Sequence, residues 1–275
     1  MSSKWLRRIA AYARGNCNVS TEKGQKIPCA GIVVIGDEIL KGEVFDTNST
    51  FLAKELHRLG LKLKKISVVS DDVQEIGDEI RLFSKTFDYV LTTGGIGPTH
   101  DDVTYEGVAL AFNEPLVLHP ELKDICCEFY RTTDPLSAGM KLAYIPRSSR
   151  LHYKTVSGAN LSYPNVSVKN VYMFPGIPEL LKKTVSEVGP LLFRSNKRFF
   201  TRAFYCNVAE YRIITELQQV VDEFPSVQFG CYPKLHHSIY QVKITVESCC
   251  EDSTSKAYER LKELIPAHYI VDVED

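Results

Sequence analysis

The sequence has no dominant charge and no long hydrophobic run. Among its 275 residues, 33 Lys and Arg balance 34 Asp and Glu, so the formal net charge is −1. That balance creates no field that would draw nucleic acid or an anionic membrane to the molecule as a whole. No apolar stretch is long enough to span a bilayer. We therefore expect neither nucleic acid nor a membrane among the partners of this protein.

Several familiar motifs are also missing. The eight cysteines include no pair with Cys-x-x-Cys spacing, which excludes a zinc ribbon or a dithiol redox site of that type. The Gly-x-Gly-x-x-Gly fingerprint of dinucleotide-binding folds is absent, and so is the Gly-Lys-Ser/Thr end of a Walker loop. We expect reduced, mostly buried thiols, and a nucleotide site must be built on a different glycine turn.

The amino-terminal segment lacks acidic residues before Glu22. On a helix, its cations cluster on one face and its apolar side chains on the other. This pattern is typical of a mitochondrial transit peptide, and a disordered tail is the alternative. We therefore expect one of the two over residues 1–28, and a protein of the mitochondrial matrix or the cytoplasm. The cations are Lys4, Arg7, Arg8 and Arg14.

Buried strands and amphipathic helices alternate through the next part of the chain. Residues 30–35 form a continuous apolar run, which is typical of a strand covered on both faces of a parallel sheet. Residues 61–70 predict a strand with one solvated face, and a helix is expected to begin at Asp71-Asp72. The alternation predicts right-handed βαβ units and a mostly parallel sheet in an α/β domain over residues 29–195. Residues 151–165 contain Gly158 and Pro164 and are expected to form a surface loop.

The chain is organised around a glycine turn at residues 91–102, between an apolar strand and a helix. Gly94, Gly95 and Gly97 allow the backbone to approach a ligand closely, and the N–H groups at such a turn favour phosphate. The alternative is a turn that needs glycine only for its geometry. Asp101 and Asp102 would repel a bare phosphate, but together with a divalent cation they would hold one. The turn therefore predicts a site for metal plus phosphate.

Three further segments are expected to face the same edge of the sheet. Asp37 and Glu38 follow the first buried strand, and residues 46–49 supply N-cap chemistry for the next helix. Pro175-Gly176 repeats the arrangement of strand, glycine turn and helix, although a plain helix start is the alternative. Together these segments predict a pocket at the carboxyl edge of the sheet.

The last part of the chain, residues 196–275, has a different pattern. Its expected elements follow the order β-α-β-β-α-β, which is that of a small α+β ferredoxin-like module. The module contains no phosphate-binding turn, so we expect it to serve in packing, dimerisation or as a lid. The expected elements span residues 199–205, 210–224, 227–232, 240–246, 255–265 and 269–273.

Four motifs occur in a fixed order along the chain. They are Gly36-Asp37-Glu38-Ile39-Leu40-x-Gly42, Asp46-Thr47-Asn48, Thr93-Gly94-Gly95-x-Gly97-Pro98-Thr99-x-Asp101-Asp102-x-Thr104-x-Glu106 and Pro175-Gly176-x-Pro178-Glu179. With these motifs the chain resembles the molybdopterin-binding (MoaB/Mog-like) domain of the CinA family, and is most similar to the amino-terminal half of eukaryotic FAD synthases, from about Ala30 to the end. This resemblance implies a three-layer α/β domain with its site at the carboxyl edge of the sheet.

The resemblance also implies an activity, the hydrolysis of a pyrophosphate in FAD or an ADP-ribose-like nucleotide with Mg, Mn or Co as divalent metal. Backbone donors at the glycine turn would bind the diphosphate while carboxylates hold the cation that neutralises phosphoryl charge. The expected metal ligands are Asp37, Asp101 and Asp102. The expected catalytic residues are Glu38 or Asp46, either of which would orient the water, and Asp102. The expected substrate contacts are Asn48, Thr93, Gly94, Gly95, Gly97, Thr99, Thr104, Pro175 and Gly176.

Two other functions stay open at this point. One is a regulatory module that binds FAD or a pterin without turning it over and associates with a separate FAD-synthesising polypeptide. The other is pterin adenylylation in molybdenum-cofactor biosynthesis, which is less favoured because Asp101-Asp102 stands where Mog-type enzymes have Arg-Asp. FMN adenylylation is not expected, because the FAD synthase family carries it in a following PAPS-reductase-like domain that these residues do not include. The family also implies a homo-oligomer.

Overall fold

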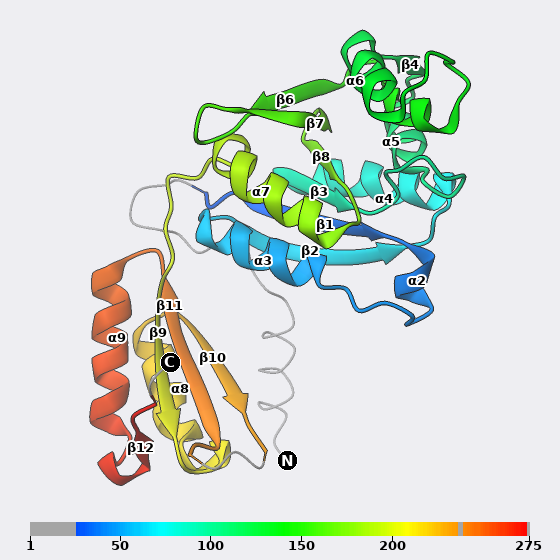
Figure 1. Cartoon of the computed structure of the whole chain (residues 1–275). Coiled ribbons are helices and arrows are strands. Elements are labelled where there is room, and N and C mark those ends of the chain that lie inside the picture. The colour runs from blue at the N-terminus through cyan, green and yellow to red at the C-terminus, as the bar shows by residue number, and fades with distance from the viewer. Residues whose placement is uncertain (1–25, 236–238, 274–275) are drawn as a thin grey trace. The chain divides into compact units, whose positions relative to one another are not determined.

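The structure is a computed structural model that describes residues 26–235 and 239–273 (Figure 1). The described chain forms two compact units, one from Ile27 to Arg198 and one beginning at Phe199. The transit peptide or tail predicted over residues 1–28 lies outside the described residues except for its last three positions, so it stays a prediction.

The first unit is built on a six-stranded sheet. Its first four strands in spatial order are parallel, and the last two are joined to the sheet by antiparallel pairings. All seven residues of the strand from Cys29 to Ile35 are buried, as expected for a strand covered on both faces. The predicted α/β class with a mostly parallel sheet is confirmed. The spatial order is β2 (Lys62–Val69), β1 (Cys29–Ile35), β3 (Tyr89–Thr93), β8 (Val171–Phe174), β7 (Asn160–Val168) and β6 (Arg150–Lys154).

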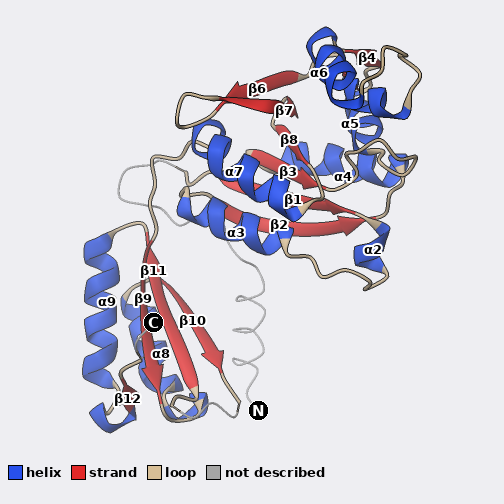
Figure 2. Cartoon of the chain, viewed as in Figure 1, coloured by secondary structure: helices blue, strands red, loops and turns tan. Residues whose placement is uncertain are grey.

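Helices cover both faces of this sheet (Figure 2), which gives the three layers that the resemblance implied. On one face, Ile76 and Ile80 of α4 (Val73–Thr86) share a buried core with Val90 of β3, and α5 (Thr104–Phe112) joins the same core. On the other face, α3 (Asn48–Arg58) and α7 (Pro178–Leu192) pack against β1 and β3. Each fully buried Leu or Ile side chain contributes about 1.5–3 kcal/mol to folding. The two cores therefore fix the sheet whose edge carries the site.

The start of α4 has a direct consequence for the site. The Asp72 side chain accepts hydrogen bonds from the backbone N–H groups of Gln74 and Glu75, each at 2.9 Å, so Asp72 is the N-cap of the helix. The predicted helix start is correct to within a residue, but only one member of the Asp71-Asp72 pair is needed for the cap. Asp71 is therefore available for another role.

Residues 151–165 are not the surface loop that the sequence predicted. Most of them lie in β6 and β7, which pair as an antiparallel hairpin at the edge of the main sheet. Pro164 lacks an N–H group, but it precedes Val166, where the pairing of β7 with β8 begins, and lies beside an irregularity in the pairing with β6. The turn residues therefore mark an irregular strand rather than its absence.

A small subdomain extends the first unit beyond α5. Its strands β4 (Leu116–Leu118) and β5 (Tyr144–Pro146) pair antiparallel. Between them lie α6 (Pro120–Tyr130) and a short 3-10 helix, η1 (Ala138–Ala143). The 3-10 helix matters for the site because it carries Lys141.

The second unit has the predicted order β-α-β-β-α-β. Its antiparallel sheet has the spatial order β10 (Gln228–Pro233), β11 (Val242–Ser248), β9 (Phe200–Cys206) and β12 (Ile270–Val271). A core that includes Phe204, Val220, Ile244 and Leu261 joins this sheet to its helices. Within the described residues, none of the helices combines the length and the apolar character needed to cross a membrane. The elements are β9 (Phe200–Cys206), η2 (Glu210–Arg212), α8 (Ile214–Glu223), β10 (Gln228–Pro233), β11 (Val242–Ser248), α9 (Glu251–Leu264), η3 (Ala267–Tyr269) and β12 (Ile270–Val271).

Candidate functional site

Four strands of the main sheet deliver the candidate site to one edge. In the parallel pairing, Ile35 of β1 lies beside Val69 of β2, and Thr93 of β3 lies beside Phe174 of β8. The segments that follow these strands therefore leave the sheet side by side, as they do in open α/β folds that bind ligands at this edge. These segments are α2 (Asp37–Leu40), the start of α4, the glycine turn and Pro175-Gly176.

Asn48 ties three of the predicted segments together. Its Nδ2 atom donates hydrogen bonds to Thr93 Oγ1 at 3.0 Å and to the Gly176 carbonyl oxygen at 2.7 Å. The Thr93 hydroxyl in turn donates to the Pro175 carbonyl oxygen at 3.2 Å. The structure thus brings these four predicted contact residues together, but their hydrogen bonds are with one another. In this arrangement they position the loops, and the Asn48 Oδ1 atom is buried without a protein partner in the described chain.

The glycine turn is held by Thr104, the first residue of α5. Its N–H donates to the Gly95 carbonyl oxygen at 3.0 Å and its hydroxyl to the Gly94 carbonyl oxygen at 2.8 Å. Gly94 has φ +103°, and a Cβ atom there would overlap the Ile35 carbonyl oxygen, so no other residue fits. The sequence identified this strand, turn and helix correctly, and Gly94 is required there for close packing of the backbone against Ile35.

The three glycine N–H groups differ in what they can bind. The Gly94 N–H donates to the Phe174 carbonyl oxygen at 3.3 Å, so it is already engaged. Within the part of the chain that the structure describes, the N–H groups of Gly95 and Gly97 have no protein acceptor. Two of the three predicted backbone donors are therefore available to a ligand.

The two carboxylates after the turn lie in different surroundings. Asp102 Oδ2 accepts hydrogen bonds from the Thr99 N–H, at 2.9 Å, and from the Thr99 hydroxyl, so Asp102 closes the turn. The Asp101 side chain is 58% exposed. Lys141, which the sequence gave no reason to select, donates from Nζ to the Thr99 carbonyl oxygen at 2.7 Å. Asp101 is thus the more accessible of the two predicted ligands.

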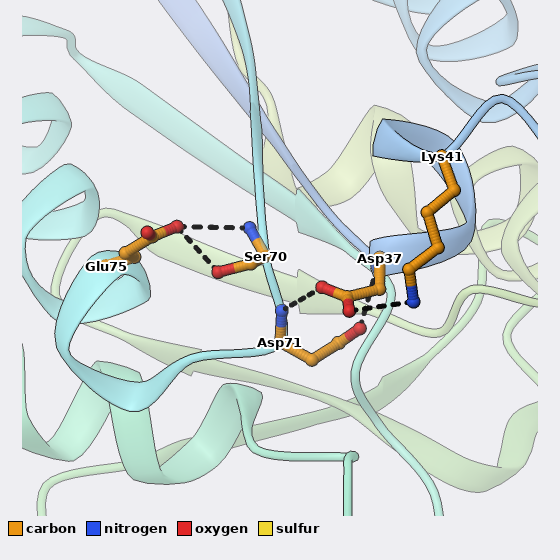
Figure 3. A network of polar contacts seen from close by, with 5 residues as sticks. All are labelled: Asp37, Lys41, Ser70, Asp71 and Glu75. Carbon is orange, nitrogen blue, oxygen red and sulfur yellow. Dashed lines mark hydrogen bonds and ion pairs between the residues drawn. The ribbon is translucent and has the colours of Figure 1, made fainter.

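Asp37 lies against Asp71, a residue that the sequence interpretation placed only at a helix start (Figure 3). The Asp37 N–H donates to Asp71 Oδ2 at 2.9 Å, and the Asp71 N–H donates to Asp37 Oδ1 at 3.4 Å. Lys41 Nζ lies 3.0 Å from Asp37 Oδ2. The doublet Asp71-Asp72 after β2 was the available signal, because a helix needs only one N-cap.

The pKa values of Asp37 and Asp71 are shifted in opposite directions. The Lys41 ammonium, followed by the Asp71 N–H, lowers the pKa of Asp37. Burial raises the pKa of Asp71, and the charges of Glu38, Asp37 and Asp101 raise it further. The charge of Asp101 acts on both residues of the pair, so Asp37, Asp71 and Asp101 form one acidic group at the sheet edge. Such a concentration of negative charge favours a cation.

The two candidates for a general base are also separated by the structure. Asp46 Oδ1 accepts a hydrogen bond from the Ser49 N–H at 2.9 Å, and the Ser49 hydroxyl donates to its other oxygen. The Asp46 carboxylate is therefore engaged with Ser49 in the first turn of α3. The Glu38 carboxylate folds back over Gly36, and its charge acts on Asp71. Of the two candidates, Glu38 is the one whose charge acts on the acidic group.

The donor set fits a cation that arrives with a phosphate better than a cage made of protein alone. Across residues 26–235 and 239–273, no group of three or more His, Cys, Asp or Glu side chains is arranged to hold a metal ion. Magnesium is usually bound by one or two carboxylates together with substrate phosphates and water. The Asp37–Asp71 pair can supply such carboxylates, whereas Asp102 is engaged with Thr99. The predicted ligand set of Asp37, Asp101 and Asp102 stays a prediction.

Comparison with known proteins assigns the chain. Residues 31–194 match the family described as "Probable molybdopterin binding domain". The chain belongs to this family. Residues 198–274 match a second family, "FAD synthase, middle domain". The resemblance drawn from the motifs of this molybdopterin-binding domain is therefore confirmed, and the second match covers the ferredoxin-like unit.

Individual relatives agree with this assignment. A "Probable FAD synthase" of Caenorhabditis briggsae is 37% identical over 262 residues, which cover 88% of this chain and 50% of that protein. A protein of Archaeoglobus fulgidus is 35% identical over 235 residues, covering 85% of this chain and 96% of that protein. A crystal structure of CinA, with unknown function, from Thermoplasma acidophilum is similar with a TM-score of 0.52 and 30% identity, over 58% of this chain and 94% of that one. The chain thus spans about half the length of the FAD synthase relative.

Proposed function

We propose that this molybdopterin-binding domain hydrolyses a nucleotide diphosphate with a divalent metal, and that FAD is cleaved to FMN and AMP. The observation that carries the proposal is the Asp37–Asp71 pair, which lies at the same sheet edge as the glycine turn. The matches to FAD synthase relatives support a flavin nucleotide as substrate.

The turn binds the diphosphate through its backbone. The N–H groups of Gly95 and Gly97 donate to phosphate oxygens, and the amino-terminal end of α5 adds a favourable dipole. Asp37 and Asp71 would hold a divalent cation, which would neutralise charge on the phosphoryl oxygens. Asp101 would add negative charge that favours the cation near the turn.

Hydrolysis requires a water molecule in line with the bond that breaks. Glu38 orients this water and accepts its proton, because its carboxylate lies at Gly36, beside Asp37 in the sequence, and its charge acts on Asp71. The water oxygen forms a bond to one phosphorus atom while the bridging P–O bond breaks. One phosphate stays on FMN and the other on AMP, so the products account for all atoms of FAD and water.

A substrate-by-metal screen on the whole chain tests the proposal. Metal-stripped protein is incubated with FAD or ADP-ribose in the presence of Mg, Mn or Co, and AMP is measured by chromatography. We expect AMP and FMN in equal amounts from FAD only when metal is present, and at least a hundredfold slower release by Asp37→Asn and Asp71→Asn. Asp252→Asn, an exposed acid of α9, is the matched control and should retain activity. AMP release by Asp37→Asn at the wild-type rate would refute the proposed role of the pair.

A binding module without turnover is the second candidate. It is favoured by the internal hydrogen bonds of Asp46, Gly94 and Asp102, which leave fewer free groups at the site than the sequence predicted. Such a module would associate with a separate FAD-synthesising polypeptide, and metal-independent FAD binding with no AMP would favour it. Pterin adenylylation in molybdenum-cofactor biosynthesis remains compatible with the family match. Two further proposals are a homo-oligomer, which light scattering tests, and a mitochondrial localisation. The localisation is tested by import of a fusion protein that carries residues 1–21.

A further inference from the structure

Lys41 forms an ion pair within the acidic group itself. We propose that its ammonium occupies the cation position on Asp37 when no metal is bound, and that Lys41 thereby sets the affinity of the site for a divalent metal. The inference deepens the proposed function, because it rests on a cation at Asp37. It concerns metal affinity and not turnover, so it can be tested separately.

The geometry assigns one oxygen of Asp37 to each neighbour (Figure 3). Oδ1 accepts the Asp71 N–H, and Oδ2 lies 3.0 Å from Lys41 Nζ. A metal ion that binds Asp37 through Oδ2 must therefore displace the ammonium. The backbone of Lys41 is held independently of its side chain, because its N–H donates to the Asp37 carbonyl oxygen at 2.9 Å.

The ammonium is able to leave. The side chains of Lys41 and Asp37 are 59% and 47% exposed, and ion pairs in such positions contribute little free energy, because both partners remain hydrated. Within the acidic group, Lys41 supplies counter-charge to Asp37 at a position that a divalent ion would also use. The same exposure means that replacing the Lys41 side chain leaves no cavity in the core.

Competition of this kind predicts a direction and a size. Removing a unit positive charge about 5 Å from a divalent cation, under nearly aqueous screening, raises the affinity for that cation about threefold to tenfold at low salt. Lys41→Gln removes the charge and keeps a polar side chain. Lys41→Arg keeps the charge and should bind metal as the wild type does.

The experiment titrates the metal-stripped full chain with Mn²⁺ alone and follows free Mn²⁺ by electron paramagnetic resonance. The matched control is Lys256→Gln, because Lys256 makes an equivalent exposed ion pair with Asp252, four residues earlier on α9, at 2.7 Å. We expect Lys41→Gln to lower the Mn²⁺ dissociation constant about threefold to tenfold at low salt, and Lys256→Gln to leave it unchanged. In an Asp37→Asn background the effect of Lys41→Gln should disappear.

The outcomes separate this inference from the proposed function. Tighter Mn²⁺ binding by Lys41→Gln supports the inference even if no substrate is hydrolysed. An unchanged or weaker affinity overturns it even if AMP is released from FAD. The absence of measurable Mn²⁺ binding by both proteins, or an equal gain in Lys256→Gln, also overturns it, because the claim requires a metal ion at Asp37.

Discussion

Replacing Asn48 with Ala should destabilise the loops of the site more than replacing any one of its exposed side chains. Asn48 is 8% exposed and makes the two hydrogen bonds that join the start of α3 to Thr93 and to Gly176. The substitution removes both bonds and leaves the Gly176 carbonyl oxygen without this donor. We therefore expect the turns after β3 and β8 to separate from α3.

The size of the effect follows from these contacts. Each hydrogen bond contributes about 0.5–1.5 kcal/mol, and an acceptor left unsatisfied at a buried position costs about 1–3 kcal/mol. Part of this loss is offset, because the substitution also removes the buried Asn48 Oδ1 atom, which has no protein partner among the described residues. We expect the free energy of unfolding of the first unit to fall by about 2–3 kcal/mol.

Urea denaturation of the full chain, followed by circular dichroism, measures the global effect. Hydrogen exchange read by mass spectrometry measures the local one, and faster exchange is expected in peptides that contain residues 93–104 and 175–181. Asn48→Asp is the matched control for size, since it keeps the side-chain volume but cannot donate to the Gly176 carbonyl oxygen, and it should be at least as unstable. A loss below about 0.5 kcal/mol for Asn48→Ala, with unchanged exchange at both turns, would refute the account of Asn48 as the joining residue.

Three other outcomes are expected. Thr104→Val removes the buried hydrogen bond to the Gly94 carbonyl oxygen and should lower the unfolding free energy by about 1–3 kcal/mol, whereas Thr104→Ser should lower it less; equal losses would contradict this. Gly94→Ala should prevent the first unit from folding normally, and a wild-type thermal midpoint would argue against the close approach to Ile35. Carbon-detected NMR should place the titration midpoint of Asp37 below 3.8 and that of Asp71 above it. The contribution of Asp37 to stability is therefore present above pH 3.8 and is lost as the pH falls through its lower folded pKa. The contribution of Asp71 is present below pH 3.8 and is lost as the pH rises through its higher folded pKa. Titration midpoints in the reverse order would contradict this assignment.

Local sequence patterns predicted the elements of the fold well. The apolar run of β1 and the spacing of Ile76, Ile80 and Phe83 in α4 are set by burial, which leaves a periodic signature in the sequence. The β6–β7 hairpin was missed, because Gly158 and Pro164 are turn formers and the strand is stabilised by neighbours far away in the chain. Tertiary pairing overrode local propensity there.

The site was predicted in outline but not in its hydrogen bonds. The motifs placed Asp37, the glycine turn and Pro175-Gly176 at one sheet edge, and the parallel register of β1, β3 and β8 brings them there. The sequence could not show that Asp102 and Asp46 would be engaged by Thr99 and Ser49, since those contacts depend on turn geometry. Asp102 and Asp46 therefore have fewer carboxylate oxygens available to a ligand than the sequence predicted.

Asp71, in contrast, is a residue of the site that the sequence did not predict. Its doublet with Asp72 was interpreted wholly as a helix start, although Asp72 alone makes the cap. The partner of Asp71 is Asp37, which lies 34 residues away in sequence, so only the adjacent carboxyl ends of β1 and β2 reveal the pair. Long-range side-chain pairing leaves no periodic signal in one sequence.

The most direct test of the account is to locate a metal ion in crystals of the full chain. Crystals soaked with Mn²⁺ and α,β-methylene-ADP, a diphosphate that resists hydrolysis, would be measured at the manganese absorption edge. The account predicts an anomalous peak about 2.0–2.3 Å from carboxylate oxygens of Asp37 and Asp71, in contact with a phosphate oxygen that faces the N–H groups of Gly95 and Gly97. A bound analogue at the glycine turn with manganese elsewhere, or an analogue bound only in the second unit, would contradict the central claim.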